Sequence, residues 1–347
     1  MKAIISHGKG AVSLENIPIP SIGSKDLLLK VFSAPICGTD NRIIKNGHFK
    51  IPEGERRVLG HEVGGEVVEV GKDIKRYKVG DRLSMAPNIG CGYCRECISG
   101  NTQLCRDYEA IGVTLNGAFA EYIKIPYQFI EQGNVYAFPS EITFEEASLA
   151  EMLATVLSGA ESCRINYADI VLIIGAGPIG ITHTMLAKIS GTQKIIVSEV
   201  SEERRMQALE FGADFVINPT DADFKDKLMS LSYGRGPDVI IIAAPSSSAQ
   251  EDSIKLVARN GRINFFGGLP KGAEDIKINS NLIHYNLITI TGTTGSNVLQ
   301  YRKAVELIIS QKIRMSKIVS KRHAFEDFKQ AFEDATSGKF LKIIFKL

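Results

Sequence analysis

The sequence predicts an α/β protein in which a doubly wound parallel sheet domain is joined to a second, mainly-β domain. Three observations support this fold class. Residues 1 to about 150 are short β-type runs separated by glycine, whereas from about residue 168 strands alternate with helices. The motif Gly175-Ala-Gly177-Pro-Ile-Gly180 lies at the first strand-to-helix junction of that alternation. A chain of 347 residues is also too long for one ordinary core, so we expect two domains.

The composition is that of an average globular protein, with 44% hydrophobic and 23% charged residues. The 41 basic and 39 acidic residues nearly cancel and form no long run of one sign, so nothing indicates binding to nucleic acid or to an anionic membrane. The N-terminal segment lacks the apolar core of a signal peptide, and no apolar stretch reaches the roughly 18 residues that span a bilayer. We therefore expect a cytoplasmic protein, in which persistent disulfides are rare.

The first part of the chain is expected to form strands rather than helices. Glycines flank its apolar runs, and Val67 to Val70 with the glycines around them are typical of a strand and a turn. The expected strands lie in the segments DLLLKVFSA, GGEVVEVG, GDRLSMAP and GAFAEYIKIP.

The second part alternates strands and helices. After the strand DIVLIIG, the segment PIGITHTMLAKIS carries Ile181, Met185 and Ile189 at helical spacing. After the strand KIIVSEV, the segment SEERRMQALEFG predicts a helix with Ser201 as N-cap and Gly212 at the C′ position. The pattern continues through DVIIIAAP, a helical stretch around SIKLVARNG, and RINFFGG, and a mixed pattern with the helical YRKAVELIIS follows after about residue 293. This alternation predicts a parallel, doubly wound sheet.

The glycine motif at residues 175–180 is typical of a dinucleotide-binding turn. Its glycines permit a tight turn, close approach of the backbone to a pyrophosphate and close helix–strand contact, and the next helix offers free N–H groups to the phosphates. Glu199 lies nineteen residues after Gly180 at the end of the next strand, where a carboxylate would bind the adenosine ribose. It would also repel the 2′-phosphate of NADP, so the sequence favours NAD, although Arg204 and Arg205 lie close by. A surface glutamate at a strand end is the alternative.

Four of the six cysteines lie in one short segment. Cys91, Cys94, Cys97 and Cys105 form the pattern C-x2-C-x2-C-x7-C. Thiolates at this spacing converge readily on one tetrahedral ion, and four sulfur ligands with no open position make a structural zinc site. The bacterial iron–sulfur run has a shorter last gap and a proline after its final cysteine, where this chain has Arg106. A redox dithiol fits three successive thiols poorly, so the spacing favours zinc over an iron–sulfur cluster or disulfides.

Cys37, in the segment ICGTDN, and the triplet Gly60-His61-Glu62 raise the question of a second metal. Taken singly, such a cysteine is usually a small buried hydrophobe, and a histidine beside a glutamate is usually an ordinary salt-bridged pair. These residues alone leave metal binding open.

Together, the motifs resemble the zinc-dependent branch of the medium-chain alcohol and polyol dehydrogenases. The resemblance runs from ICGTD, VLGHEVGGEVVEVG and YKVGDRL through the four-cysteine segment, GAFAEY and IGAGPIG to SGKFLKIIF. It implies a GroES-like catalytic domain at residues 1–152 and 293–347, interrupted by a Rossmann NAD-binding domain at 153–292. It also implies that the four cysteines form a structural zinc lobe at about residues 88–107, so that each chain holds two zinc ions.

The resemblance implies a catalytic zinc bound by Cys37, His61, Glu62 and Glu151. Glu151 stands where polyol-type members have an acid and other members have a cysteine. Such a site keeps room for an alcohol, whose hydroxyl pKa zinc lowers before hydride passes to the nicotinamide. The implied cofactor contacts are Gly175, Gly177, Pro178, Ile179, Gly180, Glu199, Arg204 and Thr155.

Thr39 matches the hydroxyl residue that lies next to the substrate oxygen in the family. Many members have a histidine three residues later, where this chain has Arg42, and an arginine cannot relay a proton by titrating. His48 or solvent would then take the proton, and an ordinary loop histidine is the alternative for His48.

Glu151 and the Gly-His-Glu triplet make the chain most similar to sorbitol, galactitol-phosphate and threonine dehydrogenases. We expect a polyol or polyol-phosphate substrate that is oxidised to a ketose. The alternative is an L-threonine 3-dehydrogenase or a simple alcohol dehydrogenase, although threonine dehydrogenases often carry the histidine that Arg42 replaces. Five basic residues lie between two of the ligand segments: Lys45, His48, Lys50, Arg56 and Arg57. They could bind a substrate phosphate or belong to a solvated loop, and we favour the solvated loop.

The segment LITITGT matches the family strand that pairs across a two-fold axis, and its apolar Leu287, Ile288 and Ile290 predict a homodimer or, preferably, a homotetramer. A zinc-free reductase or a non-catalytic nucleotide-binding relative is the competing class, and it would lack both the cysteine lobe and the Cys/His/Glu set. A nucleic-acid-binding zinc ribbon would need a basic surface, which this chain does not show.

Overall fold

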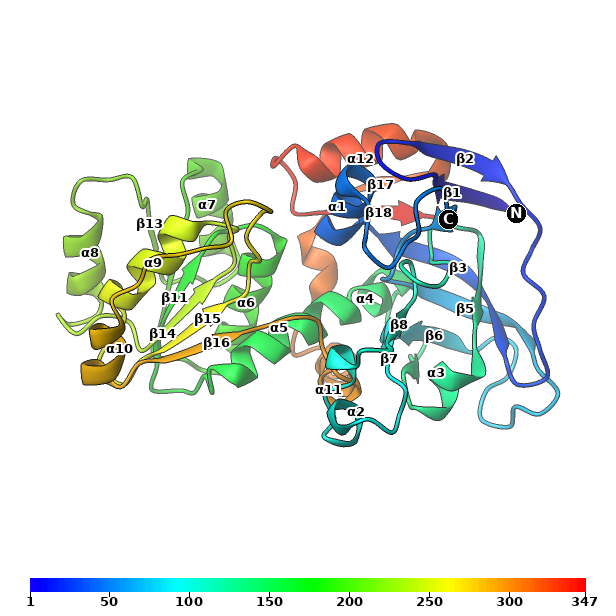
Figure 1. Ribbon diagram of the computed structural model, residues 1–347, viewed down its shortest axis with the longest axis horizontal. Coiled ribbons are helices and arrows are strands. Elements are labelled where there is room, and N and C mark those ends of the chain that lie inside the picture. Colours follow the sequence, from blue (N-terminus) through cyan, green and yellow to red (C-terminus); the bar gives the residue numbers. More distant parts are fainter. The chain divides into compact units, whose positions relative to one another are not determined.

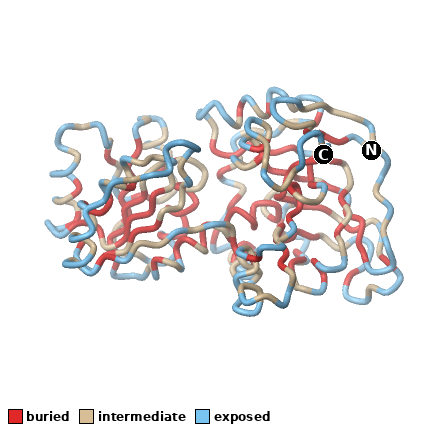
Figure 2. Tube along the Cα trace, in the orientation of Figure 1, coloured by how far each residue is buried: buried red, intermediate tan, exposed pale blue.

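A computed structural model describes all 347 residues, Met1–Leu347. The chain forms two compact units, the first made of Met1–Ala154 with Ser296–Leu347 and the second of Thr155–Gly295. The first unit therefore contains both ends of the chain, and the second is the green-to-orange segment of Figure 1. Within each unit the buried residues follow the central strands, and the loops are mostly exposed (Figure 2). Among the helices, none has the length and apolar character needed to cross a bilayer.

The first unit is mainly antiparallel β-structure. Its strands are β1 (Lys2–Ser6), β2 (Val12–Asn16), β3 (Leu27–Pro35), β4 (Arg57–Val58), β5 (Gly64–Val70), β6 (Arg82–Met85), β7 (Asn88–Ile89), β8 (Glu109–Ala110), β9 (Tyr122–Ile125), β10 (Val135–Ala137), β17 (Val319–His323) and β18 (Lys342–Lys346). The largest sheet has the order β10-β6-β5-β3-β18-β17, and β9 also pairs with β3. Smaller sheets are β2-β1-β4 and β7-β8. The last two strands of the chain, β17 and β18, thus complete the sheet that contains β3.

Helices and short turns of this unit connect the strands. They are α1 (Gly38–Asn46), α2 (Arg95–Ile98), α3 (Tyr127–Glu131), α4 (Phe144–Ser148), α5 (Ala150–Ser162, which continues into the second unit), α11 (Val298–Ile309) and α12 (Phe328–Thr336), with 3-10 turns at Thr102–Leu104, Met315–Ile318 and Phe325–Asp327. The four expected β segments are present as β3, β5, β6 and β9, so that prediction is confirmed.

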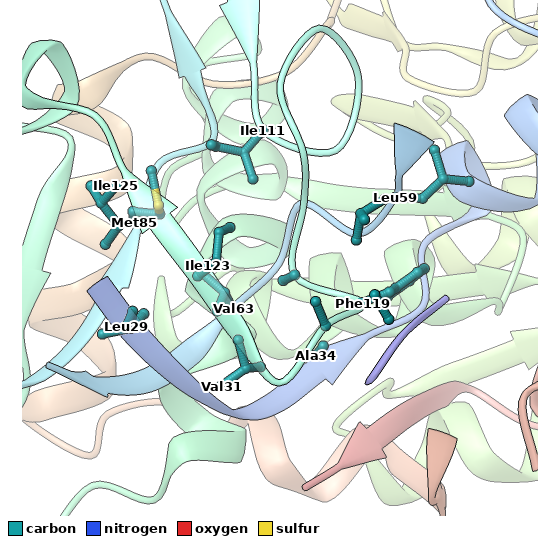
Figure 3. Packing of buried hydrophobic residues seen from close by; sticks show 14 of the residues in the cluster. Leu29, Val31, Ala34, Leu59, Val63, Met85, Ile111, Phe119, Ile123 and Ile125 are labelled. Atoms are coloured by element: carbon teal, nitrogen blue, oxygen red, sulfur yellow. The ribbon is translucent and has the colours of Figure 1, made fainter. Parts of the chain in front are cut away.

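The core of the first unit lies around β3. Leu29 and Val31 of β3 are fully buried and lie with Ile123, Met85 and Phe119 from neighbouring segments (Figure 3). Each such side chain contributes roughly 1.5–3 kcal/mol when it is removed from water. This burial fixes the positions of the strands, and the segments that follow the strand ends are fixed with them.

The second unit is a six-stranded parallel sheet. Its strands are β11 (Ile170–Ile174), β12 (Lys194–Ser198), β13 (Phe215–Ile217), β14 (Val239–Ile242), β15 (Arg262–Phe265) and β16 (Thr289–Gly292), and its helices are α6 (Pro178–Ile189), α7 (Glu202–Glu210), α8 (Phe224–Leu231), α9 (Ser247–Leu256) and α10 (Ser280–Asn286). The strand order β13-β12-β11-β14-β15-β16 is that of a doubly wound dinucleotide-binding sheet. Helices flank the strands (Figure 1), which explains why β11 and β14 are apolar on both faces.

The predicted helix signals of this unit are largely found. The Ser201 hydroxyl accepts the N–H of Arg204 as the N-cap of α7, and Gly212 follows the helix with a φ of +109°. The helix expected around SIKLVARNG is shifted. It runs from Ser247 to Leu256 and ends there because Val257 is extended.

Candidate active site

The segment after β3 carries Cys37, which precedes the first residue of α1. Asp40, in the first turn of α1, is completely buried. Its Oδ2 accepts the Cys37 N–H at 2.8 Å, and its Oδ1 accepts the Gly60 N–H at 3.2 Å. One carboxylate thus joins two segments that lie far apart in sequence, so the thiol of Cys37 and the ring of His61 are placed together. Asp40 was not identified from the sequence, although it lies inside the ICGTDN motif.

The Gly60 position accepts only glycine. Its φ is +88°, and a Cβ there would lie 2.5 Å from the ring of Phe119. The backbone can therefore turn His61 inward, where its Nδ1 is 3.4 Å from Asp40 Oδ1. Burial disfavours a charged ring, but the Asp40 carboxylate and the Cys37 thiol raise the pKa of His61 well above its usual value. Such a carboxylate behind an imidazole is the arrangement that orients histidine ligands.

Glu62 forms a buried ion pair with Lys342 of β18. Glu62 Oε1 and Lys342 Nζ are 2.6 Å apart, and both side chains are almost inaccessible. Burial raises the pKa of Glu62, while Lys342 opposes that rise. Although burial disfavours its charge, the acids Glu62 and Glu151 and the Cys37 thiol raise the pKa of Lys342. Lys342 was not identified from the sequence, because a lysine in an apolar strand end usually extends to solvent.

The ligand atoms of Cys37, His61 and Glu62 all lie within 4.8 Å of one another, close enough to surround one divalent ion. Glu62 Oε2 is buried without a hydrogen-bond partner, which fits a ligand atom directed at a metal. Sulfur, imidazole and carboxylate ligands together suit zinc. Glu151, in the first turn of α5, is also buried but lies outside this group of three. The charge of Glu151 raises the pKa of both Glu62 and Lys342, so Glu151 lies near the candidate metal centre.

We expect Lys342→Met to lower the free energy of unfolding by about 3–5 kcal/mol in protein whose Cys37, His61 and Glu62 hold no metal, because it leaves a buried carboxylate without a cationic partner. Urea unfolding measures this difference. Lys346→Met is the matched control, since Lys346 lies on the same strand with an exposed side chain, and it should change stability by less than about 0.5 kcal/mol. Equal stabilities of the two variants would contradict the prediction.

Thr39 lies in the first turn of α1, and its Oγ1 accepts a hydrogen bond from the Arg42 guanidinium at 3.3 Å. His48 follows α1, and its Nδ1 accepts the N–H of Lys50 at 3.2 Å. Partial burial, followed by the charges of Arg42 and Lys50, lowers the pKa of His48. In the neutral ring the nitrogen that could take up a proton is Nδ1, and Nδ1 already accepts the Lys50 N–H. His48 is therefore poorly suited to accept a proton from the substrate.

The basic set is mostly engaged within the protein. Arg56 pairs with Glu15 and Arg57 with Glu55. Lys50 donates to the carbonyls of Arg106 and Tyr108 and lies over the Tyr108 ring. Three of the five basic residues therefore already have partners within the protein, which favours the interpretation as a solvated loop over a phosphate site.

The four cysteines of the lobe converge. Cys91, Cys94, Cys97 and Cys105 place their sulfur atoms within 4.8 Å of one another. The sulfurs of Cys91 and Cys97 are 4.0 Å apart, close to the separation of about 3.8 Å that two sulfurs 2.3 Å from one zinc would have. All four are free thiols, and a disulfide would need about 2.05 Å. The geometry therefore suits one tetrahedral ion.

Backbone N–H groups point at these sulfurs. Cys94 N–H donates to Cys91 Sγ at 3.4 Å, and Cys97 N–H donates to Cys94 Sγ at 3.5 Å. Bonds from Tyr93 and Cys94 lower the pKa of Cys91 to about 7. Although the Cys97 N–H favours its thiolate, the surrounding protein and the other thiols raise the pKa of Cys94 to about 12. The raised pKa of Cys94 keeps that thiol protonated at neutral pH, so metal binding would release its proton.

A separate cavity of about 420 Å³ lies at the carboxyl ends of the strands in the second unit, lined among others by Gly175, Glu199, Thr220, Phe224 and Ser246. This is the position where doubly wound sheets bind nucleotides. Gly180 must be glycine, because a Cβ there would lie 1.8 Å from the Gly175 carbonyl oxygen. The space beside Gly177 is open, as close approach of a pyrophosphate requires. Pro178 and Ile179 form the first turn of α6, and Thr155 lies on α5.

Glu199 is buried at the end of β12 and held by two backbone groups. Its carboxylate accepts the N–H of Ala176 at 2.8 Å and the N–H of Ser201 at 3.0 Å. Arg204 lies 4.0 Å from it. Arg205 donates instead to the carbonyls of Glu199 and Val200, so its guanidinium is already engaged. The Glu199 carboxylate thus lies where an adenosine ribose would be expected, with the Arg204 guanidinium as its nearest cation.

We expect Glu199→Ala to weaken NAD binding by about 1.5–3 kcal/mol, the usual scale for hydrogen bonds to a charged group. The variant should also bind NADP better, because the repulsion of its 2′-phosphate is gone. Calorimetric titration with both nucleotides measures the change, with Glu202→Ala on the exposed face of α7 as the control. A wild-type protein that prefers NADP would show that Arg204 and Arg205, rather than Glu199, determine which nucleotide is bound.

A doubly wound sheet with a nucleotide cavity and a largely buried Cys/His/Glu group are together the features of a metal-dependent, nucleotide-linked dehydrogenase. The family comparison agrees. Residues 178–310 match the model described as zinc-binding dehydrogenase, and residues 23–133 match the alcohol dehydrogenase GroES-like domain. The chain belongs to the family of zinc-dependent medium-chain alcohol dehydrogenases. It is an oxidoreductase that acts on a CH–OH group with zinc and a nicotinamide nucleotide as cofactors.

Individual relatives differ in their names. The chain is 36% identical to the L-threonine 3-dehydrogenase of Pyrococcus horikoshii, over 98% of this chain and 96% of that protein. A protein described as a zinc-binding dehydrogenase from Sinorhizobium meliloti 1021, bound to NADP, superposes with a TM-score of 0.91 at 28% identity, over 100% and 99% of the two chains. The 2R,3R-butanediol dehydrogenase of Bacillus subtilis gives a TM-score of 0.90 at 25% identity, again over 100% and 99%.

Proposed function

We propose that this enzyme oxidises a secondary hydroxyl group of a small polar substrate, with NAD as hydride acceptor and the first unit as the catalytic domain. The observation that carries the proposal is the convergence of the half-buried Cys37 with the buried His61 and Glu62, where Glu62 Oε2 has no hydrogen-bond partner. An ordinary salt-bridged core pair would satisfy both carboxylate oxygens, so this arrangement supports a metal centre with a reaction to perform.

When zinc is bound there, it supplies a Lewis acid that lowers the pKa of the substrate hydroxyl, and the nicotinamide takes the hydride. The protein's own residues have separate tasks. The Asp40 carboxylate faces His61 Nδ1 at 3.4 Å and attracts its ring, and Lys342 holds one oxygen of Glu62 so that the other stays available. We assign to Thr39 the acceptance of the hydroxyl proton, because a hydroxyl group can both accept and donate. Glu151 lies close enough to add negative charge beside the centre.

NAD is the proposed nucleotide because of Glu199. The Sinorhizobium relative is bound to NADP, so membership of the family leaves the choice open. The buried carboxylate of Glu199 would accept the ribose hydroxyls and repel a 2′-phosphate, and Arg205 is engaged elsewhere. These contacts support NAD.

L-threonine is the first substrate to test, because several relatives named L-threonine 3-dehydrogenase cover nearly the whole chain at 30–36% identity. A polyol is the second candidate. Arg42 stands where threonine dehydrogenases often have a histidine, which counts against threonine but does not by itself select a polyol, and the neighbour named 2R,3R-butanediol dehydrogenase has the same fold.

The test combines metal analysis with NADH formation at 340 nm, using L-threonine, sorbitol, butane-2,3-diol and simple alcohols. Two zinc ions per chain and turnover of at least one compound would support the proposal. One zinc would favour a non-catalytic relative, and iron would refute both metal sites. Because five of the proposed ligands are thiols that must stay reduced, we also propose the cytoplasm as the location.

We propose that the second unit assembles through β16, the edge strand of its sheet. One side of β16 lacks a neighbour within the chain. Tyr285 and Leu287 beside it are 76% and 71% exposed, whereas Ile288 packs into the unit's own core and is not available for an interface. Of the three apolar residues expected at the interface, Leu287, Ile288 and Ile290, at least Ile288 would therefore not contribute to it.

We expect light scattering at micromolar concentration to show a dimer or a tetramer. Leu287→Asp should shift the protein toward monomer, because a charge at an edge strand opposes strand pairing. Met206→Asp, on the exposed side of α7, should leave the mass unchanged. A wild-type monomer would refute the proposed assembly.

A further inference from the structure

Arg42 carries a charge that nothing in the chain neutralises. Its only hydrogen bond within the protein goes to Thr39 Oγ1 at 3.3 Å, and no carboxylate lies within ion-pair distance of it. Arg56 and Arg57, the next arginines along the chain, each pair with a glutamate. Exposure to water alone also leaves an arginine without a partner, so whether Arg42 has a function depends on where it lies.

Arg42 lies next to Thr39, the residue proposed to contact the substrate hydroxyl. Thr39 and Arg42 are three residues apart on α1 and therefore lie on one face of the helix. If Thr39 accepts a hydrogen bond from the substrate hydroxyl, as proposed above, two successive hydrogen bonds place the guanidinium within about 6 Å of that oxygen. A group two or three bonds from the carbinol carbon lies at this distance.

The surroundings are positively charged. Arg42 and Lys50 both act on the pKa of His48, which shows that their charges gather around this segment. Asp40, the only acid of α1, is buried and points at Cys37 and Gly60. Among the loop acids, Glu55 is paired with Arg57, which leaves Glu53 as the exposed carboxylate of this loop. The positive charges outnumber the free negative ones.

We propose that Arg42 binds an anionic group of the substrate, a carboxylate or a phosphate, attached close to the hydroxyl that is oxidised. This inference rests on the proposed function and narrows its substrate class. One N–H of the guanidinium is used by Thr39, and the others form a planar fork that matches two oxygens of such an anion. A neutral polyol would leave the same cation beside the reacting carbon without a counter-ion.

Matched substrate pairs test this. L-threonine and L-threoninamide differ only in a carboxylate replaced by a neutral amide, and sn-glycerol 3-phosphate and glycerol differ in a phosphate. The ratio of kcat/KM within each pair isolates the anion, because loss of the contact to Thr39 affects both members equally. The two pairs separate a carboxylate substrate from a phosphate substrate. Calorimetric titration of the zinc-loaded protein with the same four compounds gives a measurement that does not need turnover.

We expect the wild type to favour the anionic member of one pair, and Arg42→Met to reduce that preference about 10- to 150-fold, mainly through KM and the binding constant. Arg42→Lys should keep part of it, because the charge remains while the fork is lost. Lys45→Met, which removes an exposed cation from the same helix, should leave the ratio within about threefold. Zinc content is measured in each variant.

Three results would overturn the proposal. They are a wild type that turns over the neutral members equally well, an Arg42→Met variant that loses both members of a pair alike, and equal binding of the anions to wild type and Arg42→Met. In the first case the dehydrogenase function stands and only the anion site fails. Binding of an anion through Arg42 without NADH formation from any compound would instead support the anion site and contradict the proposed reaction.

Discussion

Cys97→Ser is expected to unfold the cysteine lobe and to reduce the zinc content by one ion per chain. The lobe has little core of its own, since neither α2 nor the 3-10 turn at Thr102–Leu104 contains a buried residue. A metal ion must then hold it, and structural zinc contributes apparent binding energies on the order of 10–16 kcal/mol in small domains. Removing one of four ligands takes away a large part of that energy. The effect should be the largest of any single substitution outside the two cores.

Metal analysis, thermal unfolding and limited proteolysis measure this change. The variant should lose one zinc, melt at a lower temperature and be cleaved between residues 91 and 105. Cys163→Ser is the matched control, because Cys163 is a buried free thiol of the second unit that belongs to no ligand group. It should keep both zinc ions. If Cys97→Ser folded with wild-type stability but was inactive, the lobe would not be structural.

Thr39→Val is expected to lower kcat by about 10²–10⁴, the usual worth of a positioned proton transfer. Valine has the shape of threonine but can neither accept nor donate a hydrogen bond. Arg42 already donates to Thr39 Oγ1, so the hydroxyl has one acceptor position left for the substrate and must direct its own proton elsewhere. Arg42 cannot take that proton and His48 is poorly suited to it, which makes solvent the expected destination.

Steady-state kinetics with the best substrate from the panel measure this loss. Thr39→Ser should retain most of the activity, because it restores the hydroxyl without the methyl group. Zinc must be counted in both variants, since Cys37 is only two residues away. A Thr39→Val protein with full zinc and unchanged turnover would send the proton by another route and remove Thr39 from the mechanism.

Much of the second unit could be predicted from local sequence alone. An apolar strand, a glycine turn and a helix with a serine cap repeat there in order, and each signal depends on neighbours within a few residues. The parallel sheet, the α7 cap at Ser201 and Gly212 at the C′ position of α7 are found as predicted. The end of α9 was missed, because Val257 leaves the helix without a glycine or proline to mark the stop.

The candidate metal residues could be named from their motifs, but their partners could not. The segments of Cys37 and His61 point to zinc chemistry through residue type and resemblance. The sequence by itself thus determined the fold class, the family and the residues that offer ligand atoms, because residue type and short-range spacing carry that information.

Only the tertiary structure decided how those residues are held. Lys342 reaches Glu62 across 280 residues, and Asp40 joins Cys37 to Gly60 only because β3 and the Gly60 turn meet in one core. Ile288 was expected at an interface but is buried inside its own unit. Arg42, unlike Arg56 and Arg57, has no acid in contact with it in the folded chain, and its local sequence does not show this. Whether two charges pair depends on which segments, distant in sequence, the folded chain brings together. A local sequence pattern does not carry that information.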